Sequence, residues 1–226
     1  MNVSGIILSL AVAVSLNVCH TVDAVIPQVQ IDVPAEMILQ ERNKDIILVN
    51  PWNEVPEDYE VDLVHIGNGY MVDSSCYDAL MEMLGDCREE GLSPMVCSAY
   101  RSRGTQSWLH SKKINQFIGY GYSRQEAEIR ASEIVARPGT SEHQLGLAVD
   151  IVDLYNQNLN KSQENTEVQK WLMENCWDYG FILRYPTDKS DVTGIIYEPW
   201  HYRYVGVELS RDIRDSGLCL EEYLGK

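Results

Sequence analysis

Strand-like and helix-like segments follow one another irregularly along this chain, and this irregularity limits the folds open to it more than any other feature. Leu147–Val152 is an apolar stretch of strand length, whereas apolar residues at helical spacing run over 168–179 and stop at Gly180. Folds built on a parallel sheet need strands and helices in regular alternation. The sequence lacks that alternation, so it predicts an α+β fold in one domain.

Further elements are predicted from capping residues and helix breakers. Asp73 or Ser74 is expected to cap a helix that runs to about Glu90, with Gly91 just past its end. Ser123 begins a capping-box pattern that opens another helix. The remaining predictions are strands at 45–50, 94–100, 181–185 and 200–205, and helices at 105–117, 123–136 and 208–223, the last with Gly217 as a candidate break.

The N-terminal segment, residues 1–24, is predicted to be a signal peptide. Ile6–Val18 is a run of about 13 mostly apolar residues, too short to span a bilayer comfortably, and a small-residue cleavage pattern ends at Ala24. Two alternatives stay open, an uncleaved anchor helix and a lipid anchor on Cys19. We favour export with cleavage, which makes the mature protein extracytoplasmic and leaves it without a membrane span.

Charge and cysteine content narrow the classes of partner and site. The 18 Lys and Arg residues stand against 34 Asp and Glu residues, which gives a net charge of -16. This balance argues against nucleic acid as a partner and against a polybasic membrane anchor. None of the six cysteines forms a C-x-x-C pair, which argues against a cysteine-based zinc site. Residues 25–44 are polar and are expected to be a linker or N-terminal arm, so 45–226 is the predicted folded domain.

The segment Ser141–Asp150 carries the first candidate for chemistry. His143 and Asp150 are seven residues apart and are joined by a glycine turn that leads into an apolar strand. With His143 in the loop and Asp150 on the strand, the loop can fold back and bring both side chains to one point. An imidazole and a carboxylate together suit a divalent metal such as zinc.

A second candidate segment runs from Glu198 to Gly206. Pro199 argues against a helix interior, and residues three apart in an extended segment face opposite ways. Glu198 and His201 therefore need a bend near Pro199 to reach one site. A carboxylate beside a metal can take a proton from water that the metal holds.

A third candidate segment is Ser98–Ser102, followed by Gln106. Arg101 lies at the end of an apolar strand, where its guanidinium can present a fork to a carboxylate or an oxyanion. Taken singly, these residues also fit structural roles, since single histidines and strand aromatics are commonly part of a core. The sequence lacks the serine-hydrolase elbow, the S-x-x-K pair, the H-E-x-x-H motif, the phosphate loop and the dinucleotide fingerprint.

Together, the three segments resemble the VanY-type D-alanyl-D-alanine carboxypeptidases. The shared motifs are S-A-Y-R-S at 98–102, S-x-H-x-x-G-x-A-x-D at 141–150 and E-x-W-H at 198–201, in the same order along the chain. The resemblance covers roughly 45–206, with Ala99 standing where glycine is commoner. It implies the α+β fold shared with Hedgehog-type signalling domains, a small antiparallel sheet flanked by helices.

The resemblance also implies roles for individual residues. One zinc ion would be held by His143, Asp150 and His201, and Glu198 would be the general base. Arg101 would stabilise the oxyanion or hold the terminal carboxylate of the substrate. Ser141 and Gln106 match positions associated with substrate binding.

The implied activity is zinc-dependent removal of the terminal D-alanine from peptidoglycan stem peptides, a metallopeptidase reaction at the cell wall. An L,D-carboxypeptidase acting on the tetrapeptide and a D,D-dipeptidase share these motifs and remain alternatives. A zinc-stabilised binding module on the same fold is a third alternative. That module would be expected to lack the base, whereas Glu198 is present.

Overall fold

The computed structural model describes residues 46–225, so the predicted signal peptide (1–24) and linker (25–44) lie outside the described residues. The strands form a two-stranded and a four-stranded sheet. The strands are β1 (Leu63–Gly67), β2 (Tyr70–Asp73), β3 (Pro94–Ser98), β4 (Ala148–Asp153), β5 (Phe181–Leu183) and β6 (His201–Tyr204). The α-helices are α2 (Ser74–Glu89), α3 (Arg103–Gly119), α4 (Arg124–Ser132), α5 (Glu167–Asn175), α6 (Ser190–Thr193), α7 (Val207–Ser216) and α8 (Leu220–Tyr223), with 3-10 turns η1 (Glu142–Leu145), η2 (Lys161–Asn165) and η3 (Cys176–Tyr179). No helix in this part of the chain is long and apolar enough to cross a membrane.

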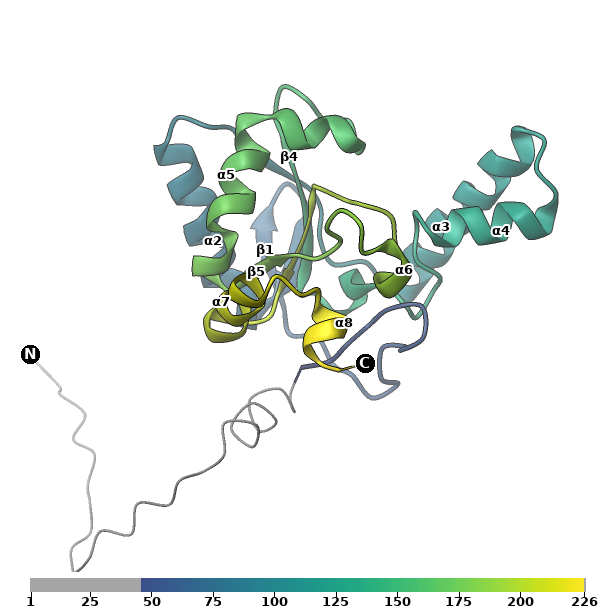
Figure 1. Ribbon diagram of the computed structural model, residues 1–226, viewed down its shortest axis with the longest axis horizontal. Helices are drawn as coiled ribbons and strands as arrows, with labels where there is room; N and C mark the ends of the chain where they lie inside the picture. The colour runs from purple at the N-terminus through teal and green to yellow at the C-terminus, as the bar shows by residue number, and fades with distance from the viewer. Residues whose placement is uncertain (1–45, 226) are drawn as a thin grey trace, which may run out of the picture. The chain divides into compact units, whose positions relative to one another are not determined.

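The larger sheet is antiparallel, with strand order β3-β4-β6-β5, and helices α2 and α5 lie side by side against it (Figure 1). The main core contains Val149 of β4 and Tyr202 of β6, paired across the two strands, with Leu80 of α2 and Leu172 of α5. Because side chains alternate between the faces of a strand, the next pair along the register points away from this core. The structure confirms the predicted α+β class and the small antiparallel sheet flanked by helices.

The neighbouring pair in this register is Asp150 and His201. Strand pairing thus places two of the sequence-predicted site residues directly opposite each other, on the sheet face turned away from α2 and α5. Helices α3 and α4 form a hairpin that extends to one side of the sheet (Figure 1). The pairing of β4 with β6 brings Asp150 and His201 to one site, although they are 51 residues apart in the chain.

Local capping explains where several helices begin. Asp73 caps α2 by accepting a hydrogen bond from the Ser75 amide at 3.0 Å, as predicted. The predicted capping box at the start of α4 is confirmed. The Ser102 hydroxyl caps α3, so this helix begins two residues before its predicted start at 105. Helix α4 ends at Ser132 rather than 136, and a turn follows in which the Ile134 and Val135 amides both donate to the Ala131 carbonyl.

The predicted strand at 45–50 is wrong. Residues 46–49 have no regular structure, and Asn50 forms an isolated bridge with Asn53. The side-chain oxygen of Asn50 accepts hydrogen bonds from the amides of Trp52 and Asn53, which closes a turn instead of extending a strand. The apolar Ile46 and Leu48 pack against a small core around α7 and α8.

The β1–β2 hairpin is absent from the sequence predictions, although Gly67-Asn68-Gly69 at its turn is a hairpin signal. The predicted final helix at 208–223 is two helices, α7 and α8. Gly217 separates them in a left-handed conformation, with φ of 67°. After this break Leu220 of α8 packs into the small core beside α7, and Glu221 is buried.

Candidate metal centre

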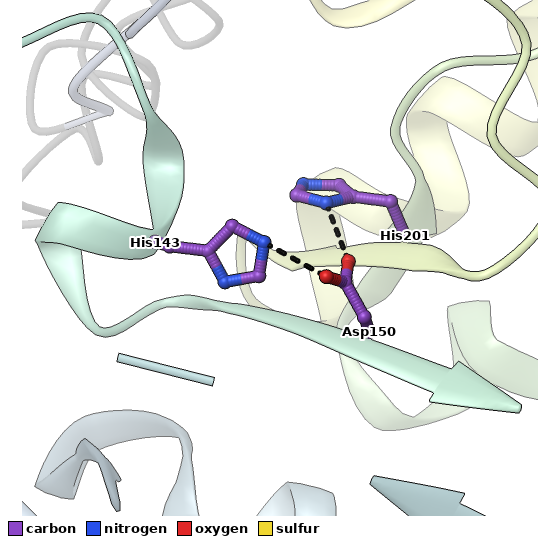
Figure 2. A group of neighbouring side chains, drawn as sticks. All are labelled: His143, Asp150 and His201. Atoms are coloured by element: carbon purple, nitrogen blue, oxygen red, sulfur yellow. Dashed lines mark hydrogen bonds and ion pairs between the residues drawn. The ribbon is translucent and has the colours of Figure 1, made fainter. Parts of the chain in front are cut away.

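The side chains of His143, Asp150 and His201 meet in the structure, with one ligand atom of each within 4.8 Å of the others (Figure 2). Asp150 Oδ2 lies 3.3 Å from His143 Nε2, and Asp150 Oδ1 lies 3.0 Å from His201 Nδ1. All three residues are buried. The loop that contains His143 folds back onto β4, as the sequence predicts.

Gly146 makes this reversal of the chain between His143 and Asp150. Its φ of 72° is left-handed, and its amide donates to the His143 carbonyl at 3.2 Å. A side chain at this position would also meet the backbone nitrogen of Asp73 at 2.9 Å. The turn thus needs glycine both for its backbone conformation and for its close approach to the start of α2.

The hydrogen bonds of His143 leave one ring nitrogen available as a ligand. Its Nδ1 lies 2.7 Å from the Ala99 carbonyl, which can only accept, so Nδ1 carries the proton. Nε2 is buried and makes no hydrogen bond to the described residues. Burial, aided by the Arg101 guanidinium, lowers the pKa of His143 to about 4 and keeps the ring neutral. The Nε2 lone pair faces a carboxylate oxygen at 3.3 Å, and the two groups repel each other. A cation bound by both groups would remove this repulsion.

The other two members of the cluster carry opposite charges in the metal-free protein. Burial opposes protonation of His201, but Asp150 and Glu142 outweigh it and raise its pKa to about 9. Burial likewise opposes ionisation of Asp150, yet the two histidines hold its pKa well below the usual range. A metal ion could bind His201 only after the ring had lost a proton. The donor set of two imidazoles and one carboxylate fits zinc.

Glu198 lies at the edge of this cluster. A turn at Pro199, closed by a 3.2 Å hydrogen bond from the His201 amide to the Glu198 carbonyl, supplies the bend that the sequence required. Glu198 Oε2 is then 3.9 Å from His201 Nδ1. Burial raises the pKa of Glu198 to about 8, and repulsion from Asp150 adds to this effect. A carboxyl group that titrates near neutral pH is suited to proton transfer.

The cluster lies in the wall of a cavity of about 570 Å³. Arg101, Ser141 and Glu198 also line this cavity, together with apolar side chains from α3 and from the segment before Glu198. Gln106 is not one of the described lining residues. It is buried behind the wall, where its amide nitrogen donates to the Ala136 carbonyl at 2.6 Å.

Sequence reasoning missed Glu142, which is buried between His201 and two arginines. Glu142 Oε2 lies 3.4 Å from His201 Nε2, and its other oxygen pairs with Arg184 and Arg203. A signal was available, because Arg184 and Arg203 stand in otherwise apolar strand segments. Buried arginines require a carboxylate partner.

Comparison with known proteins places these features in a family. The model of the VanY D-alanyl-D-alanine carboxypeptidase family matches residues 69–207. A D-alanyl-D-alanine carboxypeptidase of Enterococcus faecalis is 44% identical over 184 residues, which is 81% of this chain and 67% of that protein.

Solved structures agree with the sequence relatives. VanYB in complex with D-alanine-D-alanine has a TM-score of 0.74 at 43% identity, covering 80% of this chain and 97% of that one. A zinc complex of a VanY D,D-pentapeptidase variant has a TM-score of 0.72 at 43% identity, covering 79% and 97%. The LD-carboxypeptidase LdcB has a TM-score of 0.69 at 37% identity, covering 79% and 85%. The chain therefore belongs to the VanY family of D-alanyl-D-alanine carboxypeptidases.

Proposed function

We propose that this protein is a zinc-dependent D,D-carboxypeptidase that removes the terminal D-alanine from peptidoglycan stem peptides outside the cytoplasm. The observation that carries the proposal is the cluster of His143, Asp150 and His201 in a cavity wall, with the ionisable Glu198 beside it. Residues 1–24 would be the signal peptide, 25–44 the linker and 45–226 the catalytic domain.

The zinc ligands would be His143 through Nε2, Asp150 through its carboxylate and His201 through Nδ1. Three protein ligands leave an open coordination position, which is typical of catalytic rather than structural zinc. When bound, zinc acts as a Lewis acid that polarises the scissile carbonyl and makes water a better nucleophile at neutral pH.

Glu198 would act as the general base and then as the general acid. Its carboxylate accepts a proton from the attacking water and later delivers that proton to the amine of the leaving D-alanine. Burial keeps the pKa of the metal-free side chain near 8, and a bound cation would lower it toward the range in which the carboxylate accepts protons.

Arg101 would bind negative charge on the substrate. Its amide donates to the His143 carbonyl at 3.0 Å, which fixes the end of β3 beside the cluster, and its side chain lines the cavity. The guanidinium would stabilise the developing oxyanion or hold the terminal carboxylate. Ser141 would contact the peptide directly, whereas Gln106 would act on substrate binding through the cavity wall that it supports at Ala136.

Two related activities compete with this assignment. The likeness to LdcB favours an L,D-carboxypeptidase as the second candidate, and a D,D-dipeptidase would use the same residues. A non-catalytic zinc module is disfavoured. Burial of the Glu198 carboxyl group costs stability, and a module that only binds zinc would have no use for that group.

The test is incubation of the zinc-loaded protein with a pentapeptide ending in D-Ala-D-Ala and, separately, with a tetrapeptide ending in one D-Ala. Products are identified by mass spectrometry, with a chelator-treated sample as the control. Loss of one alanine from the pentapeptide alone supports the proposal. Cleavage of the tetrapeptide would reassign it to the L,D class, release of the dipeptide would make it a dipeptidase, and no cleavage would contradict a role in this chemistry.

A further inference from the structure

Four buried charged side chains form a network behind the candidate metal centre. Glu142 comes from η1, Arg184 follows β5, Arg203 is on β6 and Glu221 is on α8, and each is at most 2% exposed. Their formal charges sum to zero. None of the four is among the described residues that line the cavity, so they are not placed to touch substrate.

The network holds the Glu142 carboxylate from one side only. Glu142 Oε1 lies 2.7 Å from Arg184 Nε and 3.1 Å from Arg203 Nη1. Two buried guanidinium groups at these distances favour the ionised form, so Glu142 is a carboxylate. Its second oxygen, Oε2, points to His201 Nε2 at 3.4 Å.

Both arginines are themselves fixed. Arg184 makes a bidentate pair with Glu221, with Nη1–Oε2 at 2.9 Å and Nη2–Oε1 at 2.6 Å. The Asn50 side chain donates to Glu221 at 3.1 Å. Arg203 donates to the carbonyls of Tyr204 and Ile47 at 2.9 and 3.1 Å. The Glu142 carboxylate therefore cannot rotate without leaving a buried arginine unpaired.

A carboxylate at His201 Nε2 has a defined effect on the ring. It can only accept a hydrogen bond, so it favours the form with the proton on Nε2. That form leaves the Nδ1 lone pair free, and Nδ1 is the atom that lies 3.0 Å from Asp150. Partners outside the ligand shell commonly fix the tautomer and orientation of a ligating histidine in this way.

Stability alone does not account for such a network. Buried ion pairs lose the hydration of every charge, and apolar replacements are often neutral or stabilising. We propose that Glu142 is a positioning residue for the metal centre, which holds the His201 ring with Nδ1 turned toward Asp150. This inference rests on the proposed function only in taking His201 as a zinc ligand.

The key variant is Glu142→Gln, because glutamine keeps the shape but has a single acceptor oxygen. The arginines take that oxygen, so the amide NH2 group faces His201 Nε2 and favours the opposite tautomer, with the proton on Nδ1. The matched control is Glu221→Gln, which neutralises a carboxylate of the same network that pairs with Arg184 and makes no contact with His201. Both variants weaken an arginine pair, but only the first alters the partner of the metal ligand.

The measurements are zinc affinity, by competition with a chromogenic chelator, and the visible spectrum of the cobalt-substituted protein. We expect Glu142→Gln to weaken zinc binding by about 10- to 100-fold and to shift the cobalt bands, whereas Glu221→Gln changes affinity by less than about threefold. Equal losses of affinity in the two variants would overturn the inference. Unfolding curves of both metal-free variants show whether their stabilities are comparable.

A measurement on the unaltered protein keeps the inference testable if Glu142→Gln does not fold. Cadmium-113 and 15N-histidine labels report which ring nitrogen binds the metal. Coupling of cadmium to His201 Nδ1, with a proton on Nε2, supports the inference, and coupling to Nε2 overturns it. Failure of the unaltered protein to bind zinc or to cleave either peptide would instead count against the proposed function.

Discussion

Gly146→Ala is expected to destabilise the protein because the turn between His143 and Asp150 has no room for a side chain. A methyl group there would lie 2.8 Å from the Val61 side chain and 2.9 Å from the Asp73 backbone nitrogen. The left-handed backbone of Gly146 costs an L-residue about 1 kcal/mol. The shift of the backbone that is needed to make room for the methyl group costs about 2 kcal/mol more, in the range seen for overpacking. The expected loss of unfolding free energy is therefore about 3 kcal/mol.

Gly217→Ala separates these two contributions. Gly217 also has a positive φ, of 67°, but a methyl group there would meet no atom within 4 Å. This variant should lose only the backbone part, about 1 kcal/mol. Urea unfolding of the metal-free proteins, with chelator present and the slope unchanged, measures both values. Zinc affinity should fall in Gly146→Ala alone, and equal losses of stability in the two variants would refute the packing argument.

Three further predictions concern charge. Zinc binding at pH 7 should release protons, because the pKa values of His201 and Glu198 are about 9 and about 8 in the metal-free protein. Titration calorimetry in buffers of different ionisation heat measures the number of protons released per zinc ion bound. This number should be lower by about one in Glu198→Gln than in the unaltered protein. The pKa of about 4 for His143 means that its contribution to stability, about 3 kcal/mol, is present above pH 6.5 and is lost as the pH falls through 4. The difference in unfolding free energy between the metal-free protein and His143→Gln should narrow over that interval, and a constant difference would contradict the burial argument. Arg101→Lys keeps the charge but loses the paired donors of the guanidinium group, so activity should fall. A lower kcat indicates the oxyanion role, and a higher KM indicates binding of the terminal carboxylate. Unchanged kinetics would exclude both roles.

Local sequence patterns predict most of the elements that build the site. The strands at 147–152 and 200–205 follow from composition, and sheet register then places Asp150 opposite His201. The strand at 45–50 fails because its apolar residues pack on α7 and α8, a contact that local spacing does not reveal. Hydrophobic periodicity and capping residues identify helices and strands, but they do not show which other elements these pack against.

The sequence indicates that Arg184 and Arg203 need a carboxylate partner, but it does not indicate that Glu142 is that partner. Glu142 stands next to His143 and looks like an exposed charge in a polar turn. Its arginine partners lie 42 and 61 residues later in the chain, and only the fold brings them together. The candidate ligands sit within short motifs, whereas the network behind them depends on long-range packing.

The most direct test of the proposed chemistry is to measure zinc content and turnover together in Glu198→Gln. This substitution removes the proposed base and leaves His143, Asp150 and His201 in place. We expect one zinc per chain, as in the unaltered protein, and a kcat on the pentapeptide lower by about 10²- to 10⁴-fold. His201→Ala should lose both zinc and activity. Near-normal turnover in zinc-loaded Glu198→Gln would contradict the assignment of Glu198 as the base.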